Sequence, residues 1–309
     1  MVWAGLNRHR RVYCLVVCVV CAWPLGVWAQ SPEEVSALWE QATLYRDEWG
    51  TPHVFADNPR ALAFAFGYAQ AEDHLDAMSM AYRVANGRAA EVWGDYFTAS
   101  DEFSLQMGHA RRAVAALAEA DALTVDLCEG FALGANAWMV EHPDRVPEWA
   151  DGVKPPDVLA LMHCYLMSMA PFDLPKGFHR QPASHTGNAW AIAPSKSQSG
   201  EAILAINPHG YFEGPFRWYE AHLVSGPMGL NVTGATLFGL PVILMGHNAA
   251  LGWAMTPNQP DFADIYTEAG PQVETDPKSL LPEPFDEETL LYMAMMAETR
   301  LYFVQTPDG

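Results

Sequence analysis

The spacing of apolar residues divides the chain into a helical first half and a second half rich in short strands. Apolar residues recur at helical spacing over 59–84, 107–140 and 155–169. Segment 43–55 instead predicts a pair of strands broken at Gly50-Thr51-Pro52, and 31–41 is a polar segment. Beyond residue 186, apolar runs separated by Gly, Pro or Asn predict strands over 189–192, 202–206, 230–234, 242–245, 252–255 and 263–267. This order favours an α+β architecture.

The two halves are joined by a stretch without periodicity. Residues 171–186 crowd together Pro, Lys, Gly, His, Arg and Ser, which is typical of an exposed, cleavable loop. We predict a helical region over 30–170, this linker over 171–186 and a strand-rich region over 187–309. The strand-like run 301–304 is followed by a turn-type tail, so we expect the chain to be a fragment that lacks further strands.

The first 29 residues have the features of a secretory signal peptide. Arg8, Arg10 and Arg11 form a basic start, 12–20 is largely apolar, and Val27-Trp28-Ala29 offers a cleavage site. The alternative is an uncleaved membrane anchor, but the apolar run is shorter than the roughly 20 residues that a span needs. We therefore expect export across the inner membrane to the periplasm and no span in the mature protein.

Charge and cysteine content narrow the function classes. The formal net charge is −20, and it becomes −23 if residues 1–29, with three arginines and no acid, are removed. This balance repels nucleic acid and anionic lipid surfaces, so neither is expected as a partner.

After signal removal only Cys128 and Cys164 remain of the cysteines. Either two buried thiols or one disulfide is compatible with their apolar helical surroundings.

The most informative stretch is His185-Thr186-Gly187-Asn188-Ala189-Trp190, followed by Asn207-Pro208-His209. It resembles the start of the catalytic chain in the penicillin acylase family, which includes cephalosporin and acyl-homoserine-lactone acylases. In that family the motif is Ser-Asn-x-Trp, and the His of Asn-Pro-His follows the Ser by 22 residues. Gly187 and His209 are also 22 residues apart. Gly187 therefore stands where the family has its nucleophilic serine.

Further segments carry the same resemblance in order and spacing. They are 46–53, 67–73 and 87–91 before the linker, and 246–248, 252–253 and the pair Asp261 and Asp264 after it. The resemblance implies the four-layer αββα sandwich of N-terminal-nucleophile hydrolases, with a largely helical small chain. It also implies hydrolysis of a linear amide in a small N-acylated substrate, such as a β-lactam or homoserine lactone, by two chains cut from one precursor.

The family's chemistry gives position 187 two roles. A side-chain hydroxyl attacks the preceding carbonyl and cuts the precursor, and the α-amine released on the same residue then acts as the base. Gly187 can supply neither the attack nor the hydroxyl. Thr186 is the alternative nucleophile, although its use shifts His209 by one residue in register. A single base change also converts some serine codons to glycine codons, so an altered codon remains an alternative.

The resemblance assigns roles to several other positions. Pro257 falls at an oxyanion position and has no N–H to donate, whereas His209 is expected to orient the nucleophile and its amine. Asn188 and Trp190 are expected to pack and to hold the turn. The acyl pocket would be lined by Gly210, Met245 and Met255. A structural calcium ion would be held by Asp261, the Ala263 carbonyl and Asp264, with Asp173 as a looser candidate ligand; no organic cofactor is expected.

Two other function classes compete with the acylase. One is a non-catalytic periplasmic binding or scaffold protein that keeps the acylase fold as a single uncut chain. The other is a metallohydrolase that uses the acidic loop containing Asp261 and Asp264; chelation of the metal would abolish its activity. The remaining histidines show no metal-ligand spacing.

Overall fold

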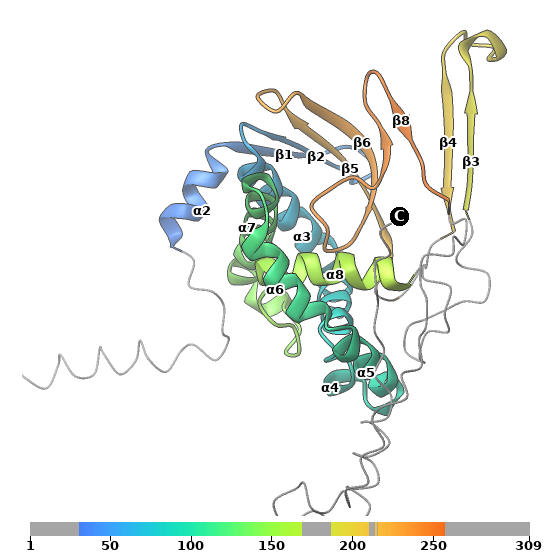
Figure 1. Ribbon diagram of the computed structural model, residues 1–309. Helices are drawn as coiled ribbons and strands as arrows, with labels where there is room; N and C mark the ends of the chain where they lie inside the picture. Colours follow the sequence, from blue (N-terminus) through green and yellow to red (C-terminus); the bar gives the residue numbers. More distant parts are fainter. Residues whose placement is uncertain (1–30, 169–186, 210–213, 215, 257–309) are drawn as a thin grey trace, which may run out of the picture. The chain divides into compact units, whose positions relative to one another are not determined.

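The computed structural model describes residues 31–168, 187–209, 214 and 216–256 (Figure 1). All of them belong to one of the chain's two compact units, Met1–Ser168 with Leu174–Pro257. The second unit, Met169–Asp173 with Asn258–Gly309, lies outside the described residues. So do the predicted signal peptide, the linker and the strands predicted over 263–267 and 301–304.

The described residues combine helices and a sheet in an α+β arrangement, as the apolar spacing predicted. In the described residues, every helical element except the short η3 precedes residue 169: α2 (Pro32–Trp39), α3 (Pro59–Ala85), α4 (Ala90–Trp93), η1 (Asp95–Phe97), α5 (Thr98–Met107), α6 (His109–Glu119), α7 (Ala122–Glu141), η2 (Pro143–Arg145) and α8 (Pro155–Ser168). In the part of the chain that the structure describes, none of these helices has the length and apolar character that a membrane span requires.

The prediction of one long helix over 107–140 is wrong, because two local features interrupt the helix. Gly108 adopts a left-handed conformation, with φ +65°, and ends α5. Asp121 is extended, and its carboxylate accepts a hydrogen bond from the backbone N–H of Thr124 at 2.7 Å. This N-cap starts α7 as a new helix after α6.

Helices α3 and α7 make the most extensive helix–helix contact among the described elements. Glycine makes their close approach possible, because a Cβ at Gly67, Gly130 or Gly134 would lie well inside 3.0 Å of the facing helix's backbone. Phe64 and Phe131 are fully buried in the same core. An Asn58 cap followed by Pro59 starts α3, and non-helical dihedrals at His74 kink it.

Strands from both sides of the linker form one six-stranded sheet, in the order β1-β2-β5-β6-β7-β8 (Figure 1). The strands are β1 (Ala42–Arg46), β2 (Pro52–Ala56), β5 (Trp218–Ser225), β6 (Leu230–Leu237), β7 (Met245–His247) and β8 (Gly252–Trp253). Neighbours pair antiparallel except β2 and β5, which are parallel. A separate hairpin consists of β3 (Gly187–Ile192) and β4 (Ile203–Pro208), joined through η3 (Pro194–Lys196).

Several strand and helix predictions need correction. The run 242–245 joins the sheet only at Met245, because the ladder with β6 begins at the pair Ala235↔Met245. Strand β5 was not predicted, since Glu220 and His222 interrupt its apolar pattern. Helices α2 and α5 were also missed. Ser31 caps α2 by accepting from the Glu34 N–H at 3.0 Å, although the segment is polar.

Buried hydrogen bonds attach α3 to the chain beyond the linker. Gln70 is fully buried; its Nε2 donates to the Leu240 carbonyl at 3.1 Å, and its Oε1 accepts from the Gly239 N–H at 2.8 Å. The Tyr82 hydroxyl donates to the Gly239 carbonyl at 2.8 Å. Because unpaired buried polar groups are costly, these bonds fix the 239–240 backbone against α3.

The two described cysteines are free thiols, which decides between the alternatives left open by the sequence. Cys128 lies on α7 and Cys164 on α8, and both are buried. Burial raises the pKa of the Cys128 thiol to about 11 and that of Cys164 to about 12. Both therefore stay protonated and unreactive at neutral pH.

A buried histidine pair links α6 to α8. The Nδ1 atoms of His109 and His163 lie 2.6 Å apart, and His109 is fully buried. Burial, with His163 and Arg112 nearby, lowers the pKa of His109 to about 3. Burial and Arg112 also lower the pKa of His163. The pair is therefore stable with neutral rings.

This pair should make the fold acid-sensitive. Because the folded pKa of His109 lies below its unfolded value of 6.5, the folded state binds fewer protons between about pH 6.5 and 3. The contribution of His109 to the free energy of unfolding is complete above pH 6.5. It is lost as the pH falls, at up to about 1.4 kcal/mol per pH unit. Denaturant unfolding of the parent and of His109→Asn from pH 7 to 4 should show a shallower loss in the variant. His247→Asn, at an exposed position, is the control; equal slopes in all three proteins would contradict the assignment.

Candidate functional site

The predicted nucleophile position and His209 meet at one end of the β3–β4 hairpin. Six antiparallel pairs run from Gly187↔Pro208 to Ile192↔Ile203, so the start of β3 lies beside the end of β4. His209 directly follows β4. The register thus places two positions that are 22 residues apart in the sequence at the same end of a two-stranded ladder.

Two asparagine side chains contact the imidazole of His209. Asn188 Nδ2 lies 2.9 Å from His209 Nε2, and Asn207 Nδ2 lies 3.3 Å from the same atom. Asn188 and Asn207 are cross-strand partners in the ladder. We expected Asn188 and Trp190 to pack and hold the turn; instead Asn188 contacts His209, and Trp190 is 56% exposed.

Position 187 has room for a side chain. A Cβ built there would meet Asn207 O at 3.4 Å, Thr256 Cγ2 at 3.7 Å and Pro208 Cα at 3.8 Å, which are ordinary van der Waals distances. The backbone φ of Gly187 is also not positive. Neither backbone conformation nor packing therefore requires glycine at this point.

Thr256, near the end of the described chain, lies where a side chain at position 187 would contact it. Thr256 belongs to the Trp253-Ala254-Met255-Thr256 element that precedes the predicted oxyanion position. Trp253 is anchored by its indole N–H, which donates to the Leu244 carbonyl at 3.0 Å. Sequence reasoning did not identify Thr256 or Asn207 as neighbours of the site. The only available signal for Asn207 was its place two residues before His209, in the matched Asn-Pro-His.

The predicted pocket residues that are described have different environments. Met245 is buried on β7, whereas Met255 is 53% exposed. Phe238 packs against Tyr219 and His74, with its ring centroid 5.0 Å from each of theirs. Phe238 is therefore a core residue. The roles of Met245 and Met255 in acyl binding stay predictions.

The remaining predicted site residues lie outside the described residues. They are Thr186, Gly210, Pro257 and the four predicted calcium ligands Asp173, Asp261, Ala263 and Asp264. Within residues 31–168, 187–209, 214 and 216–256, no group of three or more His, Cys, Asp or Glu side chains is placed to hold a metal ion.

The matched segments before the linker have a structural role. Arg46 on β1 forms ion pairs with Glu72 at 2.7 Å and Asp73 at 2.8 Å, both on α3. The hydroxyl of Tyr219 on β5 donates to the same Asp73 carboxylate. Burial and the neighbouring Asp73 raise the pKa of Tyr219 well above its usual value. This cluster therefore joins strands from both sides of the linker to one helix.

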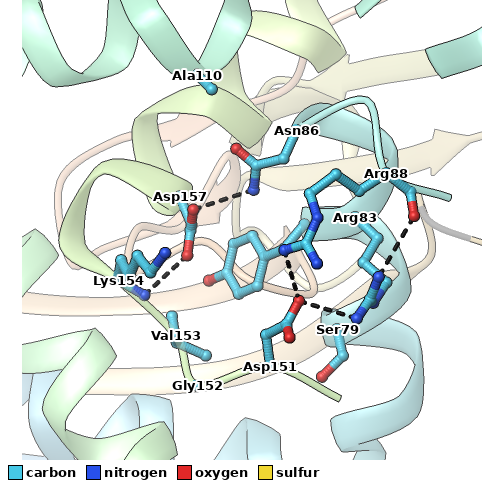
Figure 2. A pocket seen from close by; sticks show the side chains of 11 residues that line it. Ser79, Arg83, Asn86, Arg88, Ala110, Asp151, Gly152, Val153, Lys154 and Asp157 are labelled. Carbon is cyan, nitrogen blue, oxygen red and sulfur yellow. Dashed lines mark hydrogen bonds and ion pairs between the residues drawn. The ribbon is translucent and has the colours of Figure 1, made fainter. Parts of the chain in front are cut away.

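A cavity of about 200 Å³ lies in the helical region, and none of its lining residues belongs to β3 or β4 (Figure 2). On one side, Arg83 and Arg88 each form ion pairs with both Glu91 and Asp151 at 2.8–3.0 Å. On the other, Asp157 accepts from Asn86 at 3.0 Å and from the Lys154 N–H at 2.8 Å (Figure 2). Burial raises the pKa of Asp157. These charges compensate one another, so the cavity walls form a structural ion-pair cluster.

Comparison with known proteins gives one family and a set of bacterial relatives. The family described as Penicillin amidase matches residues 41–285. An acyl-homoserine lactone acylase PvdQ of Pseudomonas fluorescens (strain Pf0-1) is 28% identical over 278 residues, covering 77% of this chain and 35% of the relative. Penicillin G acylase of Escherichia coli is 23% identical over 385 residues, covering 85% of this chain and 43% of the relative. The chain thus spans less than half the length of these relatives.

Among solved structures, the thermostable penicillin G acylase from Alcaligenes faecalis, in its tetragonal form, is similar to this chain. The TM-score is 0.39 and the sequence identity 27%, with 41% of this chain and 72% of that chain covered.

The open space at position 187 should make a serine there structurally neutral. Gly187→Ser is expected to change the free energy of unfolding by no more than about 0.5 kcal/mol. A matched change, Gly246→Ser, should destabilise by about 1–3 kcal/mol or more, because its Cβ would lie inside 3.0 Å of the Thr233 backbone. Urea unfolding of the two variants beside the parent tests this. Equal destabilisation by both substitutions would show that the hairpin depends on glycine.

Proposed function

Because the chain belongs to the penicillin amidase family, we propose that it is an acylase-type amidohydrolase precursor whose catalytic position is occupied by Gly187. The observation that carries the proposal is the geometry at the start of β3. Gly187 pairs with Pro208, His209 contacts the neighbouring Asn188, and a side chain at position 187 would meet Thr256. The sequence spacing of these positions matches the family's Ser-Asn-x-Trp and Asn-Pro-His motifs. The space at position 187 suits a residue with a side chain, although the chain has none there.

The proposed chemistry uses one residue twice. In a chain with serine at 187, the hydroxyl oxygen attacks the Thr186 carbonyl carbon and the bond to the residue-187 nitrogen breaks. The hydroxyl proton passes to the departing α-amine. Water then hydrolyses the resulting ester between the residue-187 oxygen and the Thr186 carbonyl carbon. The freed α-amine serves as the base when the same hydroxyl attacks the amide of an N-acylated substrate. With Gly187, the cut and the turnover both lack their nucleophile.

Other predicted elements complete this proposal. The four-layer αββα sandwich would be completed by chain beyond the described residues. Gly210, Met245 and Met255 would line the acyl pocket. Pro257 would leave the oxyanion without one backbone donor, a loss that typically costs about 100- to 1000-fold in rate. Export to the periplasm would follow from the signal peptide. In the substrate, an amide bond would join the acyl group to a small amine, as in the substrates that the relatives' names give.

A second function is favoured by Gly187 itself. A chain that keeps the fold but lacks the hydroxyl can still hold an acylated small molecule as an uncut binding or scaffold protein. This function predicts one chain and no amide hydrolysis. Thr186 offers a third outcome, in which the parent is cut between His185 and Thr186.

Restoring serine tests the proposal. Intact-mass analysis of the secreted protein should find one uncut chain for the parent and for Gly187→Ala, and two fragments separated between Thr186 and position 187 for Gly187→Ser. Only the cut variant should release product from an N-acyl homoserine lactone or a phenylacetyl amide. A parent cut before Thr186, and uncut as Thr186→Val, would assign the nucleophile to Thr186. An uncut Gly187→Ser protein would favour the scaffold function.

A bound calcium ion is proposed for the acidic loop, with Asp261, the Ala263 carbonyl, Asp264 and Asp173 as oxygen ligands. Calcium at 100 times its dissociation constant should stabilise the protein by about 2.7 kcal/mol. Thermal unfolding with and without calcium would measure this as a rise in Tm. The rise should disappear in Asp261→Asn/Asp264→Asn, and magnesium serves as the control ion. An equal rise in that double variant would place the ion elsewhere.

A further inference from the structure

Two carboxamide groups from opposite strands converge on one nitrogen of His209. Asn188 and Asn207 face each other across the β3–β4 ladder. Both place Nδ2 beside His209 Nε2, at 2.9 Å and 3.3 Å. The ring is therefore held by two strands at once, at the end of the hairpin where position 187 lies.

The chemistry of the carboxamide determines where the ring proton lies. A carboxamide nitrogen carries two N–H donors and accepts no hydrogen bond, so His209 Nε2 must accept from both asparagines. A neutral imidazole with an accepting Nε2 carries its proton on Nδ1. A proton on Nε2 would instead direct three N–H groups toward one another.

We propose that Asn188 and Asn207 are positioning residues that hold His209 as the neutral tautomer with its proton on Nδ1. His209 then acts as a hydrogen-bond donor through Nδ1 and does not serve as a general base, because its lone pair on Nε2 is occupied. Its role in catalysis rests on the proposed acylase function. In that function, the α-amine of residue 187 remains the only base.

A second histidine in the same protein provides an internal reference with the opposite arrangement. His222 Nε2 lies 2.9 Å from Asn231 Oδ1, an atom that only accepts. His222 Nε2 must therefore donate. Its Nδ1 faces His53 Nδ1 at 2.9 Å. The two rings thus differ in which carboxamide atom they meet, and one spectrum can report both tautomers.

Long-range proton–nitrogen NMR of the full chain labelled with ¹⁵N-histidine tests the tautomer directly. His209 in the parent should show a protonated Nδ1 and an unprotonated Nε2, and His222 the reverse. Single His→Gln variants assign the signals. Asn188→Asp replaces the donor with an isosteric acceptor at an exposed position, so it should move the His209 proton to Nε2 and leave His222 unchanged. A parent His209 protonated on Nε2, or no response to Asn188→Asp, would overturn the proposal.

The catalytic role is measured separately, in the Gly187→Ser background. Adding Asn188→Ala should slow self-cleavage by about tenfold, the equivalent of losing one hydrogen bond of about 1.4 kcal/mol. Asn231→Ala is the matched control and should cleave at the Gly187→Ser rate. Equal rates with and without Asn188 would overturn the positioning role. If the tautomer is as expected and Gly187→Ser stays uncut, the proposed function fails while the assignment of the ring proton stands.

Discussion

The described structure depends on the hydrogen bonds that the buried carboxamide of Gln70 makes with backbone on the far side of the linker. Its donor and acceptor are both used, by the Leu240 carbonyl and the Gly239 N–H. A buried amide deprived of these partners would cost about 1–3 kcal/mol. Gln70 therefore stays buried without this cost only while the 239–240 backbone remains in place. This requirement makes the chain before and after the linker a single core, even though the proposed function would cut the peptide between them.

Glycine occurs in two different environments in this protein. At Gly67, Gly130 and Gly134, backbone from a second helix occupies the place of a side chain. At Gly187 that place is empty, and the backbone is in a conformation that other residues adopt. The first group is explained by packing between helices. Packing between helices does not explain Gly187, because a Cβ there would make only ordinary van der Waals contacts.

Sequence reasoning was most successful where periodicity or a matched motif was strong. The helix over 59–84, the strand pair in 43–55 and separate strands near 189–192 and 202–206 were predicted from it, whereas the pairing of those two strands into a hairpin was not. It failed where local side chains or distant partners decide the outcome. Asp121 caps a new helix inside an unbroken apolar pattern, and β5 becomes a strand through pairing with β2 and β6 despite Glu220 and His222. The sequence likewise does not show that Thr256 lies within contact distance of a side chain at position 187, because only the fold brings the two segments together.

The parallel pairing of β2 with β5 has a consequence for how the protein is made. His53 and His222 are register partners but lie 169 residues apart in the chain. At a synthesis rate of about 5–20 residues per second, β2 leaves the ribosome on the order of ten seconds or more before β5 exists. Throughout that interval one edge of β2 carries unpaired N–H and C=O groups that can pair with other unfinished chains. The edge of β2 thus stays open to such pairing until the chain through Ser225 has been synthesised.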